Sequence, residues 1–200
     1  VALTPEENAD YLAYKLVLDK ASLTDEEKSR IFDEKGALKD NDVSLAYLLW
    51  KKQAKLLNGN DMENLIKLQI IKILERFKKT ADELKKMGLS WEKLAEISKD
   101  KALLLYKKVT TFREVRYNVT GKNLLYCNFD SFLHVYLRHV EDLKVSNQFE
   151  NRDKFQLHEE DVMIVMGHVM EALNDEYQKY KNEHPDGRFY RAGKMAYYYN

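Results

Sequence analysis

The sequence predicts a mainly helical α+β protein. An N-terminal helical bundle is expected over residues 1–108, followed by a small α+β domain with a short antiparallel sheet over residues 109–200. Three observations lead to this prediction. Helix-capping signals and short connections recur through the first part. Near Val109 the composition changes to β-branched and aromatic residues in near-alternation, which is typical of strands. All five histidines follow that change.

The N-terminal part reads as five helices joined by short connections, as in a helical bundle. The first begins with Thr4 as N-cap, Pro5 at the first helical position and Glu7 completing a capping box. The second repeats the signal with Thr24 and Glu27. Glycines follow the second, third and fourth helices, as expected of helix ends. The last three helices are predicted at about residues 43–57, 61–87 and 90–108.

The C-terminal part alternates between strands and helices. Strands are predicted at residues 109–119 and 123–129, followed by a helix that Asp130 or Ser131 is expected to cap. A long helix is expected over residues 158–182, with acidic residues in its first turn. One or two strands follow the Pro-Asp-Gly turn. The sequence stops inside that last predicted strand, so we expect the domain to continue past Asn200.

The composition excludes several classes of protein. The 33 basic and 33 acidic residues give a net charge of zero, which argues against binding nucleic acid by bulk electrostatics. A single cysteine, Cys127, excludes an internal disulfide and a multi-cysteine zinc site. No apolar run approaches the roughly 18 residues of a membrane span. We therefore expect a soluble chain with no cofactor.

The helix FLHVYLRHVEDL concentrates histidine and arginine. At about 100° per residue, one continuous arc of its surface is apolar and predicts the core face. That arc contains Phe132, Leu133, Tyr136, Leu137, Val140 and Leu143. His139 lies at its border. The opposite, polar face carries His134, Arg138, Glu141 and Asp142.

Two interpretations of His134 and Arg138 remain open. A histidine can transfer a proton near neutral pH, and an arginine one turn away can bind phosphate or stabilise developing charge. Alternatively the face is merely solvated, and Arg138 pairs with Glu141 or Asp142. His139 is either a further catalytic group or a histidine hydrogen-bonded to backbone. A metal shared by His134 and His139 is disfavoured, because their i,i+5 spacing does not bring two imidazoles to one ion.

The last segment, GRFYRAGKMAYYY, places basic residues among aromatic ones. Arg188, Arg191, Lys194 and Tyr198 are candidate substrate-binding residues, since such patterns bind phosphate and stack bases. An ordinary half-exposed strand at a sheet edge has the same composition, so both interpretations stay open.

The remaining histidines are expected to be structural. His158 is predicted to cap the long helix, and His168 to pack in an apolar stripe of valines. His184 precedes a proline and is expected in a turn.

The order of elements together with HVYLRH resembles a group of ribonucleases. A strand, a helix with H-x3-RH, a long amphipathic helix and a basic, aromatic strand are similar to toxin domains of the barnase–EndoU–colicin–RelE superfamily. Such domains end bacterial polymorphic toxins and often follow a helical segment. The resemblance covers residues 109–200.

This resemblance implies metal-independent RNA cleavage by attack of the ribose 2′-hydroxyl on the adjacent phosphate. It implies that His134, His139 and Arg138 form the catalytic group and that the last strand contacts the substrate. It also implies an immunity protein as partner and delivery into the cytoplasm of a target cell. The alternative, from another class, is a non-enzymatic helical interaction module whose histidines are structural.

Overall fold

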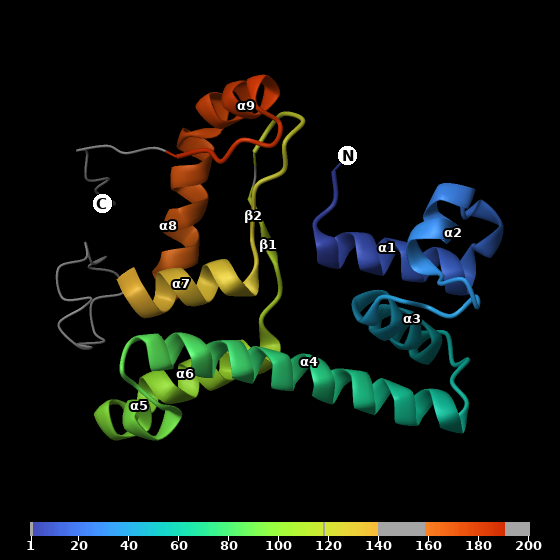
Figure 1. The fold of residues 1–200 in the computed structure, drawn as a ribbon, viewed down its shortest axis with the longest axis horizontal. Helices are drawn as coiled ribbons and strands as arrows, with labels where there is room; N and C mark the ends of the chain where they lie inside the picture. Colours follow the sequence, from blue (N-terminus) through green and yellow to red (C-terminus); the bar gives the residue numbers. More distant parts are fainter. Residues whose placement is uncertain (1, 118, 140–158, 191–200) are drawn as a thin grey trace. The chain divides into compact units, whose positions relative to one another are not determined.

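The computed structural model describes residues 2–117, 119–139 and 159–190 (Figure 1). Most of these residues are helical, and the one sheet among them is a two-stranded antiparallel pair, so the predicted mainly α, α+β class is confirmed. The elements are α1 (Pro5–Leu18), η1 (Lys20–Ser22), α2 (Asp25–Ile31), α3 (Asn41–Gln53), α4 (Gly59–Lys86), α5 (Trp91–Ile97), α6 (Lys99–Thr111), β1 (Val115–Arg116), β2 (Tyr126–Cys127), α7 (Phe129–His139), α8 (Glu159–Ala172) and α9 (Asn174–Glu183).

The chain forms two compact units whose boundary lies inside α4. The first unit comprises Leu3–Phe77, and the second comprises Val1–Ala2 and Lys78–Asn200. This boundary differs from the change of composition at Val109, because α5 and α6 belong to the second unit. Whether residues 1–108 can be separated in solution stays a prediction.

The first unit is built on α1, which packs against α3. Both predicted capping boxes are present, since the Thr4 and Thr24 side chains accept from the backbone N–H groups of Glu7 and Glu27 at 3.1 Å. These caps satisfy N–H groups that a helix start otherwise leaves unpaired. The buried hydrophobic core of this unit contains Ala9, Leu12, Leu23, Ile31 and Val43.

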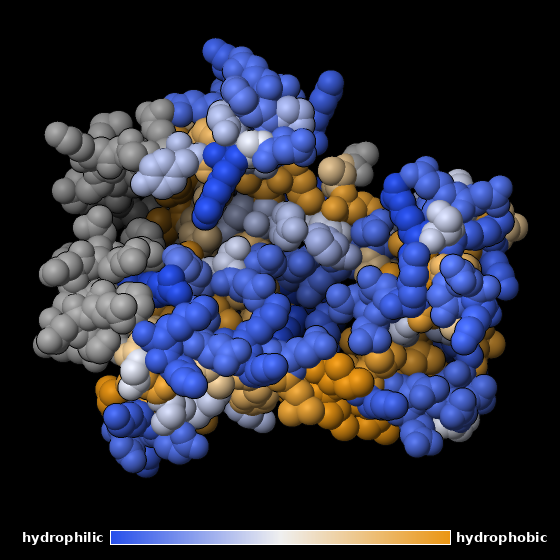
Figure 2. Space-filling view, viewed as in Figure 1, coloured by the Kyte–Doolittle hydropathy of each residue, from blue (hydrophilic) through white to orange (hydrophobic). Residues whose placement is uncertain are grey.

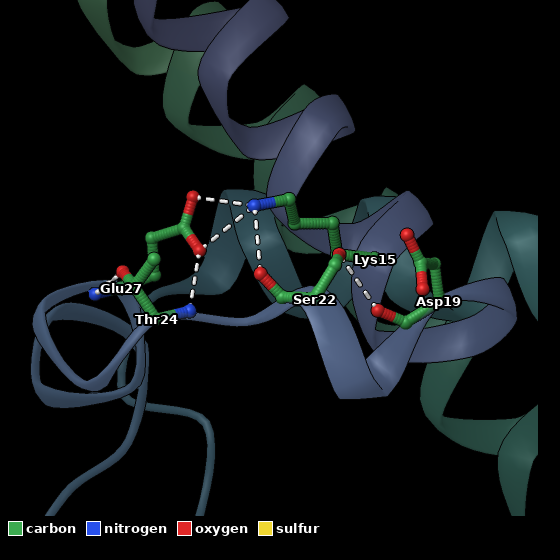
Figure 3. Close-up of polar contacts among 5 residues, drawn as sticks. All are labelled: Lys15, Asp19, Ser22, Thr24 and Glu27. Atoms are coloured by element: carbon green, nitrogen blue, oxygen red, sulfur yellow. Dashed lines mark hydrogen bonds and ion pairs between the residues drawn. The ribbon is translucent and has the colours of Figure 1, made fainter.

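A buried lysine joins α1 to the start of α2 (Figure 3). Lys15 Nζ donates to both carboxylate oxygens of Glu27 at 2.9 Å and to the Ser22 carbonyl at 3.2 Å. The same carboxylate closes the capping box by accepting from the Thr24 backbone N–H. A hydrogen bond with Tyr11, and then the bond to Glu27, raise the pKa of Lys15. These bonds fasten α1 to the start of α2, so we assign the cluster a structural role.

The N-terminal half of α4 presents two different sides. One side carries buried Leu65. On the same side Lys72 and Arg76 form ion pairs with Glu6 of α1, at 3.6 and 3.5 Å. An ion pair between Lys51 of α3 and Asp61 adds to this side. The other side is apolar and exposed.

The second unit has an aromatic core beneath α7. Phe112, Phe129, Phe132 and Tyr136 are buried, with successive ring centroids 5.2–5.6 Å apart. Such aromatic contacts stabilise a core beyond the area they bury. These contacts determine which face of α7 points into the core.

The loop between β1 and β2 is fastened to α9 by amide groups. Gln178 Nε2 donates to the Asn123 carbonyl at 2.7 Å, and Gln178 Oε1 accepts from the Asn123 backbone N–H at 2.9 Å. Buried Asn174 donates to the Thr120 carbonyl at 2.9 Å. Because buried polar groups are costly when unpaired, this paired set defines one position for the loop on α9.

Gly121, in this loop, should be more sensitive to substitution than Gly36. Its φ is +121°, and a Cβ there would lie 2.5 Å from Gln178 Cδ and Oε1. Gly121→Ala is expected to lower the free energy of unfolding by about 3 kcal/mol, since it combines backbone strain with loss of the amide contacts. Gly36→Ala is the control: its φ is +76° with open space around it, and about 1 kcal/mol is expected. Equal losses in urea unfolding would contradict the proposed clash.

The predicted strand at 109–119 and helix at 90–108 need correction. Residues 109–111 end α6 instead of starting a strand, and β1 is confined to Val115–Arg116. The hydroxyls of Thr110 and Thr111 donate to the Lys107 carbonyl at 3.0 and 2.7 Å, which satisfies them within the helix. The predicted fifth helix is two helices, since Ser98 caps α6 by accepting from the Lys101 N–H.

Four further features differ from prediction. The long helix is interrupted at Leu173, where Asn174 turns toward Thr120 and starts α9. The third helix ends at Gln53, and Gly59 begins α4 instead of following a helix end. Helix α7 is capped by Asn128, which accepts from the Ser131 N–H at 2.9 Å. No strand is present at residues 188–190, and the rest of that predicted strand lies outside the described residues.

Candidate functional site

Helix α7 has the predicted division into a core face and a polar face. Phe132, Leu133, Tyr136 and Leu137 are buried, whereas His134 is exposed. The predictions for Val140, Glu141, Asp142 and Leu143 fall outside the described residues. His139 is the last residue of α7, and its side chain also lies outside them.

The polar face of α7 is joined to the C-terminal part of α4. Arg138 Nη2 donates to Glu83 Oε2 at 2.7 Å, and both side chains are mostly buried, with 17% and 20% exposed. Lys86 contacts the same carboxylate at 2.5 Å, and Lys79 pairs with Asp130 at 3.0 Å. We call this set the α4–α7 polar surface: Lys79, Glu83, Lys86, Asp130, His134 and Arg138. It belongs to the second unit.

His134 lies in the middle of this surface along α7. It is one helical turn from Asp130 on one side and one turn from Arg138 on the other. An exposed imidazole can exchange protons with a substrate, and the three cations of the surface can bind phosphate oxygens. The solvated-face interpretation named Glu141 or Asp142 as the partner of Arg138. Among the described residues, Arg138 instead pairs with Glu83 of α4.

The pKa of Glu83 is held below its ordinary value. Burial by itself raises it, but the hydrogen bonds from Lys86 and Arg138 outweigh that effect. The carboxylate therefore stays ionised at neutral pH and orients the Arg138 guanidinium. A phosphate that reaches Arg138 has to bind beside Glu83.

The Arg138–Glu83 pair should make stability depend on acid pH. Because the folded pKa of Glu83 is depressed, its contribution is present above the ordinary value of 4.5 and disappears as pH falls through the folded value. Glu83→Gln should lower the free energy of unfolding by about 1–2 kcal/mol at pH 7 and by progressively less below pH 4.5. Urea unfolding across this range measures the difference. A loss that is constant with pH would contradict the ionised pair.

The structure does not bring Arg188 to α7. Arg188 follows the turn after α9, where the chain packs back on α9 with Phe189 5.6 Å from the rings of Tyr177 and Tyr180. In Figure 1 this segment and α7 lie apart. The other expected substrate-binding residues, Arg191, Lys194 and Tyr198, lie outside the described residues.

Two of the remaining histidines, His168 and His184, belong to α8 and to the end of α9. His168 was expected to be packed among valines, but it is 57% exposed and contacts Glu171 at 3.9 Å. The imidazole faces solvent and Glu171, which lies one helical turn further along α8. His184 stacks on Tyr180 at the end of α9, in the turn that was predicted. His158 lies outside the described residues.

Cys127 and Tyr117 form a buried pair without reactive character. Burial raises the pKa of the Cys127 thiol, and burial followed by the neighbouring Cys127 raises that of the Tyr117 phenol. A protonated, buried thiol is a poor nucleophile. We assign both side chains to the core.

Four members of the α4–α7 polar surface were not predicted as site residues: Asp130 of α7, and the three residues Lys79, Glu83 and Lys86 of α4. The contacts of Lys79 and Glu83 with α7 span 51 and 55 positions, and the sequence contains no signal for them. The i,i+4 and i,i+3 spacing of the three residues indicates only that they share one side of α4.

No group of three or more potential metal ligands occurs in the described part of the chain. Within the same residues, no helix combines the length and hydrophobicity that crossing a membrane requires. No family model matches the chain, and neither a curated protein nor a solved structure is significantly similar to it.

Proposed function

We propose that the chain is a metal-independent ribonuclease whose reaction takes place on the α4–α7 polar surface. The observation that carries the proposal is the position of His134, exposed between Asp130 and Arg138 on a surface that also carries Lys79 and Lys86. A proton-transferring side chain with several cations around it is what phosphodiester cleavage by an internal hydroxyl requires. The resemblance of HVYLRH and its flanking elements to toxin-type ribonucleases supports the same reaction.

In this reaction a base removes the proton of the ribose 2′-hydroxyl, and the oxygen attacks the adjacent phosphorus. The bond from phosphorus to the 5′-oxygen of the next nucleotide breaks, and an acid protonates that oxygen. The products are a 2′,3′-cyclic phosphate and a 5′-hydroxyl. His134 serves as one of the two proton-transfer groups. The resemblance to toxin-type ribonucleases implies His139, the last residue of α7, as the second.

Arg138 stabilises the charge that develops on the phosphate, and Glu83 holds its guanidinium in place. The proposal replaces Arg188 with Lys79 and Lys86 as phosphate contacts, because Arg188 lies in the segment that packs on α9 and away from α7. These few cations in a chain of zero net charge imply modest affinity for RNA that falls with added salt.

The test is incubation of the chain, and of a version extended past Asn200, with total RNA in EDTA at several pH values. Cleavage that persists in EDTA and changes most around neutral pH supports the proposal, since histidine titrates there. RNA left intact by both proteins at every pH contradicts it.

A second candidate function, protein interaction through α4, is favoured by a separate observation. Met62, Ile66, Ile70 and Leu74 form a row along one side of α4 and are 41%, 51%, 52% and 60% exposed. Figure 2 shows hydrophobic surface along this part of the helix. We call these four residues the exposed α4 row. An exposed apolar row of this length is typical of a surface that binds another helix.

A second copy of the chain is the partner that we propose for this row. Its members are four residues apart, so a two-fold axis that passes between Ile66 and Ile70 places Met62 opposite Leu74 of the copy and Ile66 opposite Ile70. Two rows of this spacing interdigitate at a crossing angle of about −50°. Because the net charge of the chain is zero, charge repulsion between two copies does not oppose this pairing.

A further inference from the structure

A cavity of about 470 Å³ lies at the end of the second unit that is formed by α8, α9 and the segment after α9. Met170 and Leu173 supply one wall, Tyr177 and Phe189 another, and Tyr190 borders it. Lys181 is the charged residue among those that line it. Its size is that of pockets which bind small molecules.

The aromatic wall is held in place by its own contacts. The Phe189 ring meets Tyr177 edge-on, with centroids 5.6 Å apart, and lies 5.6 Å from the ring of Tyr180. The Tyr177 hydroxyl donates to the Leu124 carbonyl at 3.4 Å, which directs the ring toward the loop between β1 and β2. A wall fixed in this way provides a preformed surface for an apolar or aromatic group.

Lys181 brings a positive charge to the cavity without an acidic partner among the described residues. Its Nζ donates to the Pro185 carbonyl, and to the Gly187 carbonyl at 3.1 Å. An ammonium group has three donors, and two carbonyls orient it without neutralising its charge. An anionic group of a ligand supplies both the third acceptor and the opposite charge.

We propose that this cavity binds a small organic anion in which a carboxylate or sulfonate is attached to an aromatic or aliphatic body. The body contacts Met170, Leu173 and Phe189, and the anion contacts Lys181. In Figure 1, α9 and α7 lie apart, so this site is separate from the α4–α7 polar surface and independent of RNA cleavage.

The test uses two fluorescent probes of similar shape with the whole chain. One is the anion 8-anilinonaphthalene-1-sulfonate, and the other is the neutral N-phenyl-1-naphthylamine. We expect saturable binding of both, with the anion bound more tightly. Lys181→Met, which keeps the aliphatic part of the side chain, should weaken binding of the anion by about tenfold or more and that of the neutral probe by less than about threefold.

Two controls accompany this variant. Lys179→Met removes a charge from an exposed position of α9 and should leave the affinity for both probes unchanged. Met170→Trp fills the cavity from α8 and should weaken both probes alike. Circular dichroism establishes that each variant is folded.

Two results would overturn the proposal. The first is an affinity for the anion that Lys181→Met leaves unchanged in a folded protein. The second is a rise of about tenfold or more in the affinity for both probes when residues 191–200 are removed. That rise would mean that the chain's own C-terminal residues compete for the cavity.

Discussion

Replacing His134 by alanine is expected to lower RNA cleavage by about two powers of ten or more, because the reaction loses a proton-transfer group. The same change should alter the free energy of unfolding by no more than about 0.5 kcal/mol, since His134 is exposed on the polar face of α7. Initial rates on an oligoribonucleotide and urea unfolding of the same preparations measure the two effects.

His168→Ala is the matched control, because it removes an exposed histidine from another helix of the same unit. It should leave both cleavage and stability unchanged. Arg138→Ala should also lower cleavage by about two powers of ten, but it removes a partner of Glu83 and should destabilise the fold as well. A stability loss for His134→Ala as large as that for Arg138→Ala would show that His134 is structural and not catalytic.

The second large effect is expected on the exposed α4 row. Changing Ile66 and Ile70 together to lysine should weaken self-association by about a hundredfold or more, since it places four charges at the centre of the paired helices. Both isoleucines are about half exposed, so folding should be little affected. Sedimentation equilibrium over about 1 to 100 μM measures the dissociation constant.

Asn64→Lys with Glu75→Lys is the control for this double change. Both positions are exposed on α4, on the side opposite the exposed α4 row, so the control adds two lysines without touching it. The control should associate as the unchanged chain does. A chain that remains monomeric at about 100 μM, or a control that loses association equally, would contradict pairing through this row.

The elements that were well predicted are those fixed by neighbouring residues. The capping boxes at Thr4 and Thr24 need only a side chain three positions away, and both are present. The long helix at 61–87 was also well placed, since α4 runs from Gly59 to Lys86.

The errors arose where a distant contact or an alternative partner decided the structure. The break at Leu173 depends on a bond from Asn174 to Thr120, 54 positions earlier. The β-branched residues at 109–111 favoured a strand, but backbone carbonyls of α6 accept from the two threonine hydroxyls and keep them helical. Intrinsic β preference is weak enough for such contacts to override it.

The candidate site was predictable only where residues of one helix determine it. The exposure of His134 follows from the spacing of Phe132, Leu133, Tyr136 and Leu137 within one helix. The pairing of Arg138 with Glu83 spans 55 positions, and no local pattern indicates it. The place of Arg188 likewise depends on how Phe189 packs on α9.

The most direct test of the central claim is mass spectrometry of the products formed from a short oligoribonucleotide in EDTA. The account predicts fragments with a 2′,3′-cyclic phosphate and a 5′-hydroxyl, and no cut after a nucleotide that carries 2′-deoxyribose. Cleavage that continues after such a nucleotide, fragments with a 5′-phosphate, or an oligonucleotide left intact by both the chain and its extended version would contradict it.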